Sequence, residues 1–414
     1  MIDRKVLISI LGRASKKDGQ YKTAKYFFPS DNHNANGNSK PTAFSGWALL
    51  EYLRPDAMLI LGTSGSDWPF LLLDAVQNDS AQSEAFDKLT ESFANHTVTQ
   101  QQLDTFTPQL QKHLGGDVAL QIVPTGRTEV EQLSLLKVVA EHIAEGDKVF
   151  LDLTHGFRHQ PILLLMVAIY LRTVRSASIE KIYSSFFDET TGEAELFDLS
   201  GLLRLIDWTS ALAGYEKDGD LGVFVRLLSQ DRASDSSLKH LKDAAFADRT
   251  HAFETAFSKS RSFARELEQQ PMQGVSGIFQ DYLVKQLATK NEDSPALRLV
   301  KRAKKHLHYG DYDRVAILGE VAFLSHFAKP EENLADPKNL DLIKDEVMSA
   351  QRPTGVLWEP YNIMRRIRNT FAHVQSPDKD LRPFFRDENS LHQKLDELLN
   401  VLEKHILQKR SGVA

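Results

Sequence analysis

Short, almost continuous apolar runs alternate with helical patterns through the first 200 residues of the chain. The runs lie at 6–11, 57–62, 118–124, 147–153, 180–187 and 193–199. We expect the last of them, EAELFDL, to form an edge strand. Strands that lack polar alternation are buried on both faces, which is typical of parallel sheets. The sequence therefore predicts an α/β domain with a mostly parallel sheet and helices on both faces.

The pattern changes at about residue 200. From there to the C-terminus the chain reads as a succession of helices whose interiors hold almost no Gly or Pro, and no further buried strand is expected. We therefore predict three parts. They are an α/β domain at 1–200, a helical linker at 201–234 and an all-α domain at 235–414.

Composition narrows the class of protein. The net charge of −6 is mild, and the chain has no cysteine, which excludes disulfides, cysteine-ligated zinc and cysteine nucleophiles. The fourteen histidines show no metal-ligand spacing, so we expect no metal. The longest apolar run, 162–171, is about half of a membrane span, and no secretory signal is visible, so we expect a cytoplasmic protein without membrane contact.

Four of the predicted strands end in small, polar or glycine-containing turns. They read GRAS at 12–15, GTSGSD at 62–67, PTGR at 124–127 and THGFR at 154–158. In open α/β sheets, ligands bind at the carboxyl ends of the strands, and free N–H groups at helix N-termini suit anions. None of the turns is a P-loop or a dinucleotide fingerprint, so ATP hydrolysis and dinucleotide redox chemistry have no support. The class of ligand that these turns still suit is a phosphate-bearing, nucleotide-like molecule.

The turn DLTHGFRHQP at 152–161 is the most polar of the four and precedes the most apolar helix. In one interpretation, Gly156 only serves the backbone and Thr154 only caps the helix. In the other, these residues and Arg158 hold a ligand.

A second candidate site lies in the late helical segment 358–375, which contains RNTFAH. One face of this helix is apolar, whereas the other carries Arg365, Arg366, Asn369 and His373. A histidine moves protons near neutral pH, and arginines hold phosphate, which suits RNA cleavage without a metal. The alternative is a solvated polar face with His373 near the helix C-terminus.

The spacing of this motif points to a dimer. Five residues rotate by about 140° on an ideal helix, so Arg368 and His373 do not share a face, whereas Asn369 and His373 do. Two facing helices in a two-fold dimer would pool both arginines and both histidines in one cleft.

A basic run, RLVKRAKKHLHYGDYDR, occupies 298–314. It is either a solvated helix face or a track for RNA phosphates. Glu320, in the otherwise apolar AILGEVAFL, is expected to pair with one of the arginines.

Taken together, DLTHGFR after a buried strand, the helical second half and the late RNxxxH motif resemble the CARF–HEPN ribonucleases of type III CRISPR systems, the Csx1/Csm6-like group. The stretch 309–320 is also similar to the helix before the motif in this family. The resemblance covers nearly the whole chain. It implies a Rossmann-like, dimeric CARF domain that senses a cyclic oligoadenylate, with cyclic tetra-adenylate as the expected ring, and no cofactor. It further implies a HEPN domain that cleaves single-stranded RNA in antiviral defence, in a homodimer or a larger homo-oligomer.

The resemblance also implies site residues. The catalytic set would be Arg368, Asn369 and His373. In the reaction, the RNA 2′-hydroxyl attacks phosphorus and leaves a 2′,3′-cyclic phosphate. The ligand contacts would be Gly12, Arg13, Ala14, Ser15, Thr63, Ser64, Gly65, Ser66, Thr125, Gly126, Arg127, Asp152, Thr154, His155, Gly156 and Arg158.

Two alternatives stay open. In the first, the chain is a non-catalytic CARF–HEPN module that senses the ligand and docks RNA or protein. In the second, the CARF domain is itself a ring nuclease that cleaves its activator, with His155, Thr154 and Ser15 as candidates. The asparagine-rich insertion at 31–41 has no assigned role.

Overall fold

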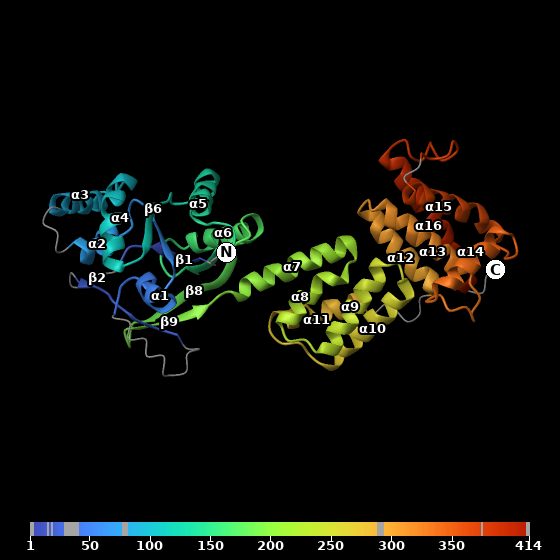
Figure 1. Cartoon of the computed structure of the whole chain (residues 1–414), viewed down its shortest axis with the longest axis horizontal. Helices are drawn as coiled ribbons and strands as arrows, with labels where there is room; N and C mark the ends of the chain where they lie inside the picture. The colour runs from blue at the N-terminus through green and yellow to red at the C-terminus, as the bar shows by residue number, and fades with distance from the viewer. Residues whose placement is uncertain are drawn as a thin grey trace. The chain divides into compact units, whose positions relative to one another are not determined.

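The computed structural model describes residues 4–14, 16–17, 20–28, 41–76, 82–287, 294–373 and 376–410. Two of the predicted features, Ser15 and residues 31–40 of the insertion, lie outside these ranges. The chain divides into two compact units, Met1–Leu203 and Arg204–Ala414 (Figure 1). The first is α/β and the second is all-helical, so the predicted fold classes are confirmed.

The first unit is built on a seven-stranded sheet with the order β4-β9-β8-β7-β1-β5-β6, beside a small β2-β3 hairpin. The strands are β1 Lys5–Leu11, β2 Lys16–Lys17, β3 Gln20–Tyr21, β4 Lys25–Phe27, β5 Ala57–Gly62, β6 Asp117–Ile122, β7 Lys148–Asp152, β8 Ser178–Asp188 and β9 Glu193–Asp198. In the described part of the seven-stranded sheet, every neighbouring pair is parallel except β8 and β9, which are antiparallel. The carboxyl ends of β7, β1, β5 and β6 therefore meet at one edge.

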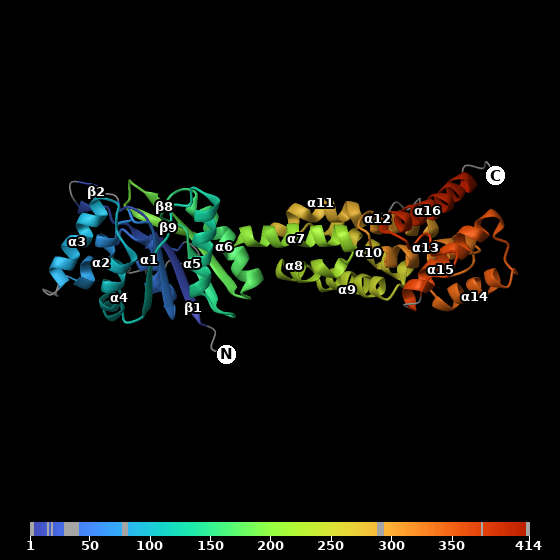
Figure 2. The ribbon, with the colours of Figure 1, turned by 90° about the horizontal axis from the view of Figure 1, so that it is seen from above.

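Helices cover both faces of this sheet, as the apolar strands require. They are α1 Ser45–Leu53, α2 Trp68–Val76, α3 Ser83–Ala94, α4 Gln100–Leu114, α5 Glu129–His142 and α6 Gln160–Val174. Leu7 and Met58 pack into one apolar cluster with Leu49 and Leu103, from α1 and α4. Successive strand residues point to opposite faces, so Ile8 is buried on the other side. Figure 2 shows α5 and α6 on the face opposite to α1 and α4.

The prediction that 193–199 forms an edge strand was wrong. Residues Glu193–Asp198 form β9, but β4 pairs with its outer side in parallel, from Lys25 opposite Glu193 to Phe27 opposite Glu195. With three residues, β4 is too short to give a recognisable hydrophobic pattern. β4 and β9 are far apart in the sequence, and hydrophobic periodicity carries no information on which distant strands pair.

The second unit holds α7 to α16. The helices are α7 Gly201–Asp218, α8 Val225–Gln230, α9 Asp235–Arg249, α10 Phe253–Gln269, α11 Val275–Leu287, α12 Pro295–His308, α13 Tyr312–Phe327, α14 Pro337–Met348, α15 Trp358–Ala372 and α16 Glu388–Arg410. Two short 3-10 turns, η2 Leu221–Phe224 and η3 Gly355–Leu357, lie between them. None of the helices in the described ranges combines the length and apolarity needed to cross a membrane.

Two apolar clusters hold these helices together. Trp208 and Phe224, from the segment predicted as a linker, pack with Leu241 and Phe263 of α9 and α10. The second cluster joins α12, α13, α15 and α16, and it buries Ile367 beside the RNxxxH motif. α7 and α8 therefore belong to the packed core of the second unit.

Candidate functional site

The loops after β1 and β5 are tied together at the carboxyl edge of the sheet. The backbone N–H of Asp67 donates to the carbonyl of Gly12 at 3.0 Å, and Ser66 Oγ donates to the carbonyl of Leu11 at 2.7 Å. The loop after β7 also approaches Gly12, because a Cβ on this glycine would lie 2.9 Å from the backbone nitrogen of Gly156. Three of the four predicted loops, those after β1, β5 and β7, therefore do converge. They do so where the strand order reverses, between β1 and β7, which is the usual ligand crevice of such sheets.

Two polar residues of the turn after β7 form hydrogen bonds with other residues of the chain. The buried carboxylate of Asp152 accepts hydrogen bonds from Ser45 Oγ at 2.6 Å and from the N–H of Thr154 at 3.0 Å. His155 Nε2 accepts the N–H of Ser45 at 3.2 Å, and its ring stacks on Phe44 at 5.8 Å between centroids. Burial lowers the pKa of His155, although the charge of Asp152 opposes this shift. Asp152 and His155 thus fasten the turn to the start of α1.

The same turn leaves polar atoms without a partner. Thr154 Oγ1 and Gln160 Nε2 are both buried, and neither makes a hydrogen bond among the described residues. Gln160 Oε1 accepts the N–H of Phe157 at 2.9 Å, which orients its amide. Arg158 is exposed and makes no ion pair within the described ranges. Buried hydroxyl and amide groups without partners are costly, so they mark a place where a ligand can supply the missing hydrogen bonds.

Hydrogen bonds within the loop after β5 fix its conformation. The N–H of Thr63 donates to Ser66 Oγ at 2.9 Å, and the N–H of Gly65 donates to Thr63 Oγ1 at 3.3 Å. Ser64 lies between these anchors and is partly exposed. Thr63 and Ser66 are therefore occupied, whereas the Ser64 hydroxyl makes no hydrogen bond among the described residues.

Arg13 lies beside this loop and binds residues that the sequence did not single out. Arg13 Nε donates to the carbonyl of Gly65 at 3.2 Å, and one of its NH2 groups lies 2.8 Å from His96 Nε2. Its guanidinium also stands 5.5 Å from the ring centre of Phe93. His96 follows α3 with a positive φ of 58°, a local feature with no sequence signature. The adjacent Ala14 is partly exposed.

In the loop after β6, an acidic side chain takes the place that an anion would occupy. Glu131 Oε2 accepts the N–H groups of Gly126 and Arg127, both at 2.9 Å, and Thr125 Oγ1 at 3.2 Å. These bonds, that from Arg127 first, lower the pKa of Glu131. Glu131 was not among the predicted site residues, although the spacing Thr128-x-x-Glu131 resembles a capping box. The N–H groups of this loop are not free in this state.

In the second unit, Arg368 is held by a carboxylate from another helix. Arg368 Nε donates to Oε2 of Glu320, which is buried in α13. α13 and α15 approach each other closely beside this pair, because a Cβ on Gly319 would lie 2.8 Å from the sulfur of Met364 on α15. The predicted pairing of Glu320 with an arginine is confirmed. The ion pair raises the pKa of Arg368, which remains a cation.

His373 directly follows α15 and is its C-cap residue. Its N–H donates to the carbonyl of Asn369 at 3.0 Å, and its side chain is exposed. No hydrogen bond joins the side chains of Arg368, Asn369 and His373 in the described part of the chain. The three residues thus lie on the last two turns of one helix, with Arg368 turned toward α13 and His373 toward solvent. This agrees with the angular separation expected from the spacing.

The neighbouring arginine is also neutralised. Arg366 forms ion pairs with Asp378 at 2.7 Å and with Asp380 at 2.6 Å. Among the described residues, no cluster of three or more His, Asp or Glu side chains is arranged to hold a metal ion. On the same helix, Arg365 donates to Asn362 Oδ1 at 3.0 Å, so the three arginines near the motif all bind other side chains while His373 is exposed.

Comparison with known proteins shows which protein family the first unit resembles. Residues 6–189 match the model of the CARF domain of the CRISPR system endoribonuclease Csx1. The chain is also 25% identical, over 249 residues, to the CRISPR-associated protein MJ1674 of Methanocaldococcus jannaschii. That match covers 55% of this chain and 38% of the length of the relative.

Proposed function

The first unit of this chain is a CARF domain of the kind found in CRISPR-system Csx1 endoribonucleases, and from this premise we propose that the chain is a ribonuclease switched on by a cyclic oligoadenylate. The observation that carries the proposal is the joining, in one chain, of this domain to a helical unit in which Arg368, Asn369 and His373 end a single helix. The helical unit would be a HEPN domain, acting in type III CRISPR defence.

The ligand would bind where the loops after β1, β5 and β7 converge. Thr154 Oγ1 and Gln160 Nε2 can each make the hydrogen bond that they lack, and Arg158 can approach a phosphate. A second messenger with repeated adenosine and phosphate groups presents both kinds of partner. Cyclic tetra-adenylate is the ring that we expect, without a metal or other cofactor.

RNA cleavage would proceed without a metal. The 2′-oxygen of the RNA attacks the adjacent phosphorus while the bond from phosphorus to the 5′-oxygen breaks, which leaves a 2′,3′-cyclic phosphate and a 5′-hydroxyl. His373 would take the 2′-hydroxyl proton or give one to the leaving oxygen. Arg368 would offset the charge that builds on phosphorus, and Asn369 would orient His373.

Dimerisation would complete this site. α5 and α6 present exposed apolar side chains on one unit, namely Val130, Leu133, Ile162 and Met166, with exposures of 77%, 58%, 63% and 47%. Several exposed apolar side chains on two helices that pack against each other suit contact with a second copy of the chain. Binding of the ring to the paired CARF domains would then favour the arrangement of the helical units that cleaves RNA.

The test is a cleavage assay with single-stranded RNA, a panel of cyclic oligoadenylates of different ring size, and EDTA throughout. We expect cleavage with one ring size, and products that end in a 2′,3′-cyclic phosphate. His373→Ala should abolish cleavage and leave ring binding intact, whereas the same change at the exposed His308 should leave both unchanged. Undiminished cleavage by His373→Ala would rule out the assigned site.

A second function, a non-catalytic module that senses the ring and docks RNA or protein, is favoured by one observation. Arg368 and Arg366 are both ion-paired, so neither guanidinium is free for a phosphate in this state. RNA binding without cleavage, with every ring tested, would select this function. A ring-nuclease activity has less support, because His155 is fastened to Ser45 and its pKa is lowered by burial.

A further inference from the structure

A cavity of about 360 Å³ lies within the second unit. Its walls come from the end of α7, η2 and the helices α9 to α12, so it is separate from the RNxxxH motif on α15. Its volume is in the range of small-molecule sites in proteins. Neither the CARF match nor the proposed cleavage reaction accounts for it.

The lining of the cavity is strongly basic. Among the described residues it includes five cationic side chains, Lys217, Arg298, Lys301, Arg302 and Lys305, against the single carboxylate of Asp248. Four of the five belong to α12 and follow one another at helical spacing, so they form one stripe, while Val300, Ala303 and Leu307 face the core. The basic run at 298–314 is therefore more than a solvated face, because one of its stripes lines a cavity.

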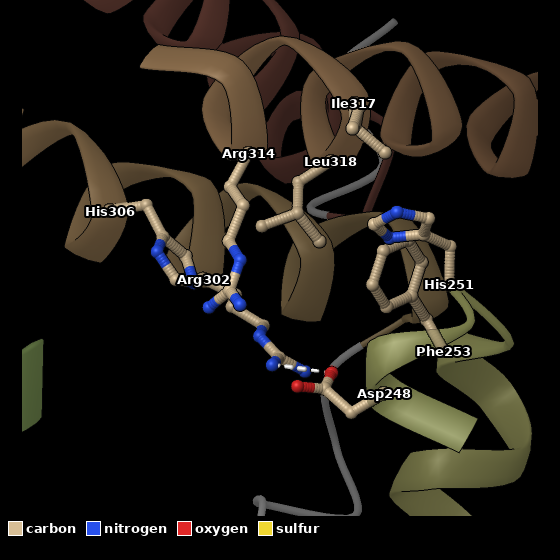
Figure 3. Close-up of a pocket in the computed structure, with 8 residues that line it drawn as sticks. All are labelled: Asp248, His251, Phe253, Arg302, His306, Arg314, Ile317 and Leu318. Atoms are coloured by element: carbon tan, nitrogen blue, oxygen red, sulfur yellow. Dashed lines mark ion pairs between the residues drawn. The ribbon is translucent and has the colours of Figure 1, made fainter. Parts of the chain in front are cut away.

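Carboxylates hold three of these cations in place. Arg302 pairs with Asp248 at 2.5 Å, and Figure 3 shows this ion pair among the residues that line a smaller neighbouring hollow. Arg298 pairs with Glu254 at 2.9 Å, and Lys305 pairs with Glu216 at 2.7 Å. Lys217 makes no ion pair among the described residues, so its positive charge remains available to attract an anion into the cavity.

Aromatic and apolar side chains form the rest of the wall. The Arg298 guanidinium lies 5.1 Å from the ring centre of Phe257, and Lys305 Nζ lies 5.2 Å from that of Tyr215. Leu221 and Leu287 line the same space and are buried. Burial raises the pKa of Tyr215 to about 12, so its hydroxyl stays protonated at neutral pH. The cavity thus offers flat apolar surfaces next to a group of cations.

We propose that this cavity is a second ligand site that takes a mononucleotide. The phosphate would lie among Lys217, Arg298 and Lys305, where ordered cations suit a doubly charged group. The base would lie against Phe257 and Tyr215, since aromatic rings stack on any base. A free inorganic anion would use only the cations. This inference does not rest on the proposed RNA cleavage.

The test is calorimetric titration of the full chain with AMP, GMP, CMP, UMP and inorganic phosphate. We expect mononucleotides to bind more tightly than phosphate. Lys217 is exposed and makes no ion pair among the described residues, so Lys217→Ala should fold normally and weaken nucleotide binding by about tenfold. Phe257→Leu should weaken nucleotide binding while leaving phosphate binding unchanged.

Two further variants serve as controls. Lys338→Ala removes an exposed lysine on α14 and should leave nucleotide binding unchanged. Arg158→Ala, in the first unit, should also leave it unchanged, which separates this site from the CARF ligand site. The proposal is overturned if no mononucleotide binds at millimolar concentration, if only RNA binds, or if Lys217→Ala and Phe257→Leu both bind nucleotides as the unmodified chain does.

Discussion

Glu320 on α13 holds the guanidinium of Arg368 on α15 from beneath the RNxxxH motif. Glu320 Oε1 makes no hydrogen bond among the described residues, so only the other carboxylate oxygen, Oε2, has a partner. The pair fixes the arginine of the motif against the core while His373 remains exposed. An RNA phosphate that recruits Arg368 must therefore compete with a buried carboxylate.

Glu320→Ala should lower the free energy of unfolding by about 3 kcal/mol, because it leaves the half-buried charge of Arg368 without its partner. Urea denaturation measures this loss. Glu331→Ala, at an exposed position, is the matched control and should change stability little. Equal stability of the two variants would show that Arg368 finds another partner or water when Glu320 is absent.

Thr154→Val should separate stability from ligand binding. The buried Thr154 Oγ1 has no hydrogen-bond partner in the described residues, so a methyl group in its place should leave the unfolding midpoint unchanged or slightly higher. Binding of cyclic tetra-adenylate should weaken by about tenfold if the hydroxyl contacts the ring. Thr90→Val, on the exposed face of α3, is the control. Unchanged ring affinity would remove Thr154 from the ligand site.

Ile162→Glu should convert the chain from dimer to monomer. Ile162 is 63% exposed on α6, so the change should not disturb the fold, but it places a charge in the apolar surface that we assign to the second copy. Sedimentation measures the mass. Ile278→Glu, at a 70% exposed position on α11, controls for the added charge. A dimer that survives Ile162→Glu would place the interface elsewhere.

His326 should make the second unit less stable in acid. Burial, then the charges of His405 and Lys409, lower the pKa of His326 from 6.5 to about 4. Between these values the unfolded chain binds a proton that the folded chain does not, so stability is lost as the pH falls from 6.5 toward 4. His326→Phe should reduce the slope of the urea midpoint against pH in this window. His308→Asn, at an exposed position, is the control and should leave this slope unchanged. If His326→Phe has the same slope as the unmodified chain, His326 is not the group responsible.

Much of the candidate site was predictable, but its internal contacts were not. The turn after β7 was recognised from its polar residues. Nothing in the sequence showed that Asp152 and His155 would bind Ser45, more than 100 positions away, while Thr154 would stay without a partner. In the same way, Glu131 accepts hydrogen bonds from the N–H groups of the loop after β6, although its spacing from Thr128 resembles that of an ordinary helix cap. By contrast, Glu320 was recognisable because a lone carboxylate in an apolar helix needs a cation.

The sequence by itself determined most of the long helices and strands of this protein, the change from α/β to all-helical structure, and the angular separation of Arg368 from His373. These follow from hydrophobic periodicity and helix geometry, which are properties of neighbouring residues. Only the tertiary structure decided that β4 covers β9, that Glu320 receives Arg368, and that a stripe of α12 lines a cavity. Such contacts join segments far apart in the chain, and they depend on how buried faces pack, which local patterns do not encode.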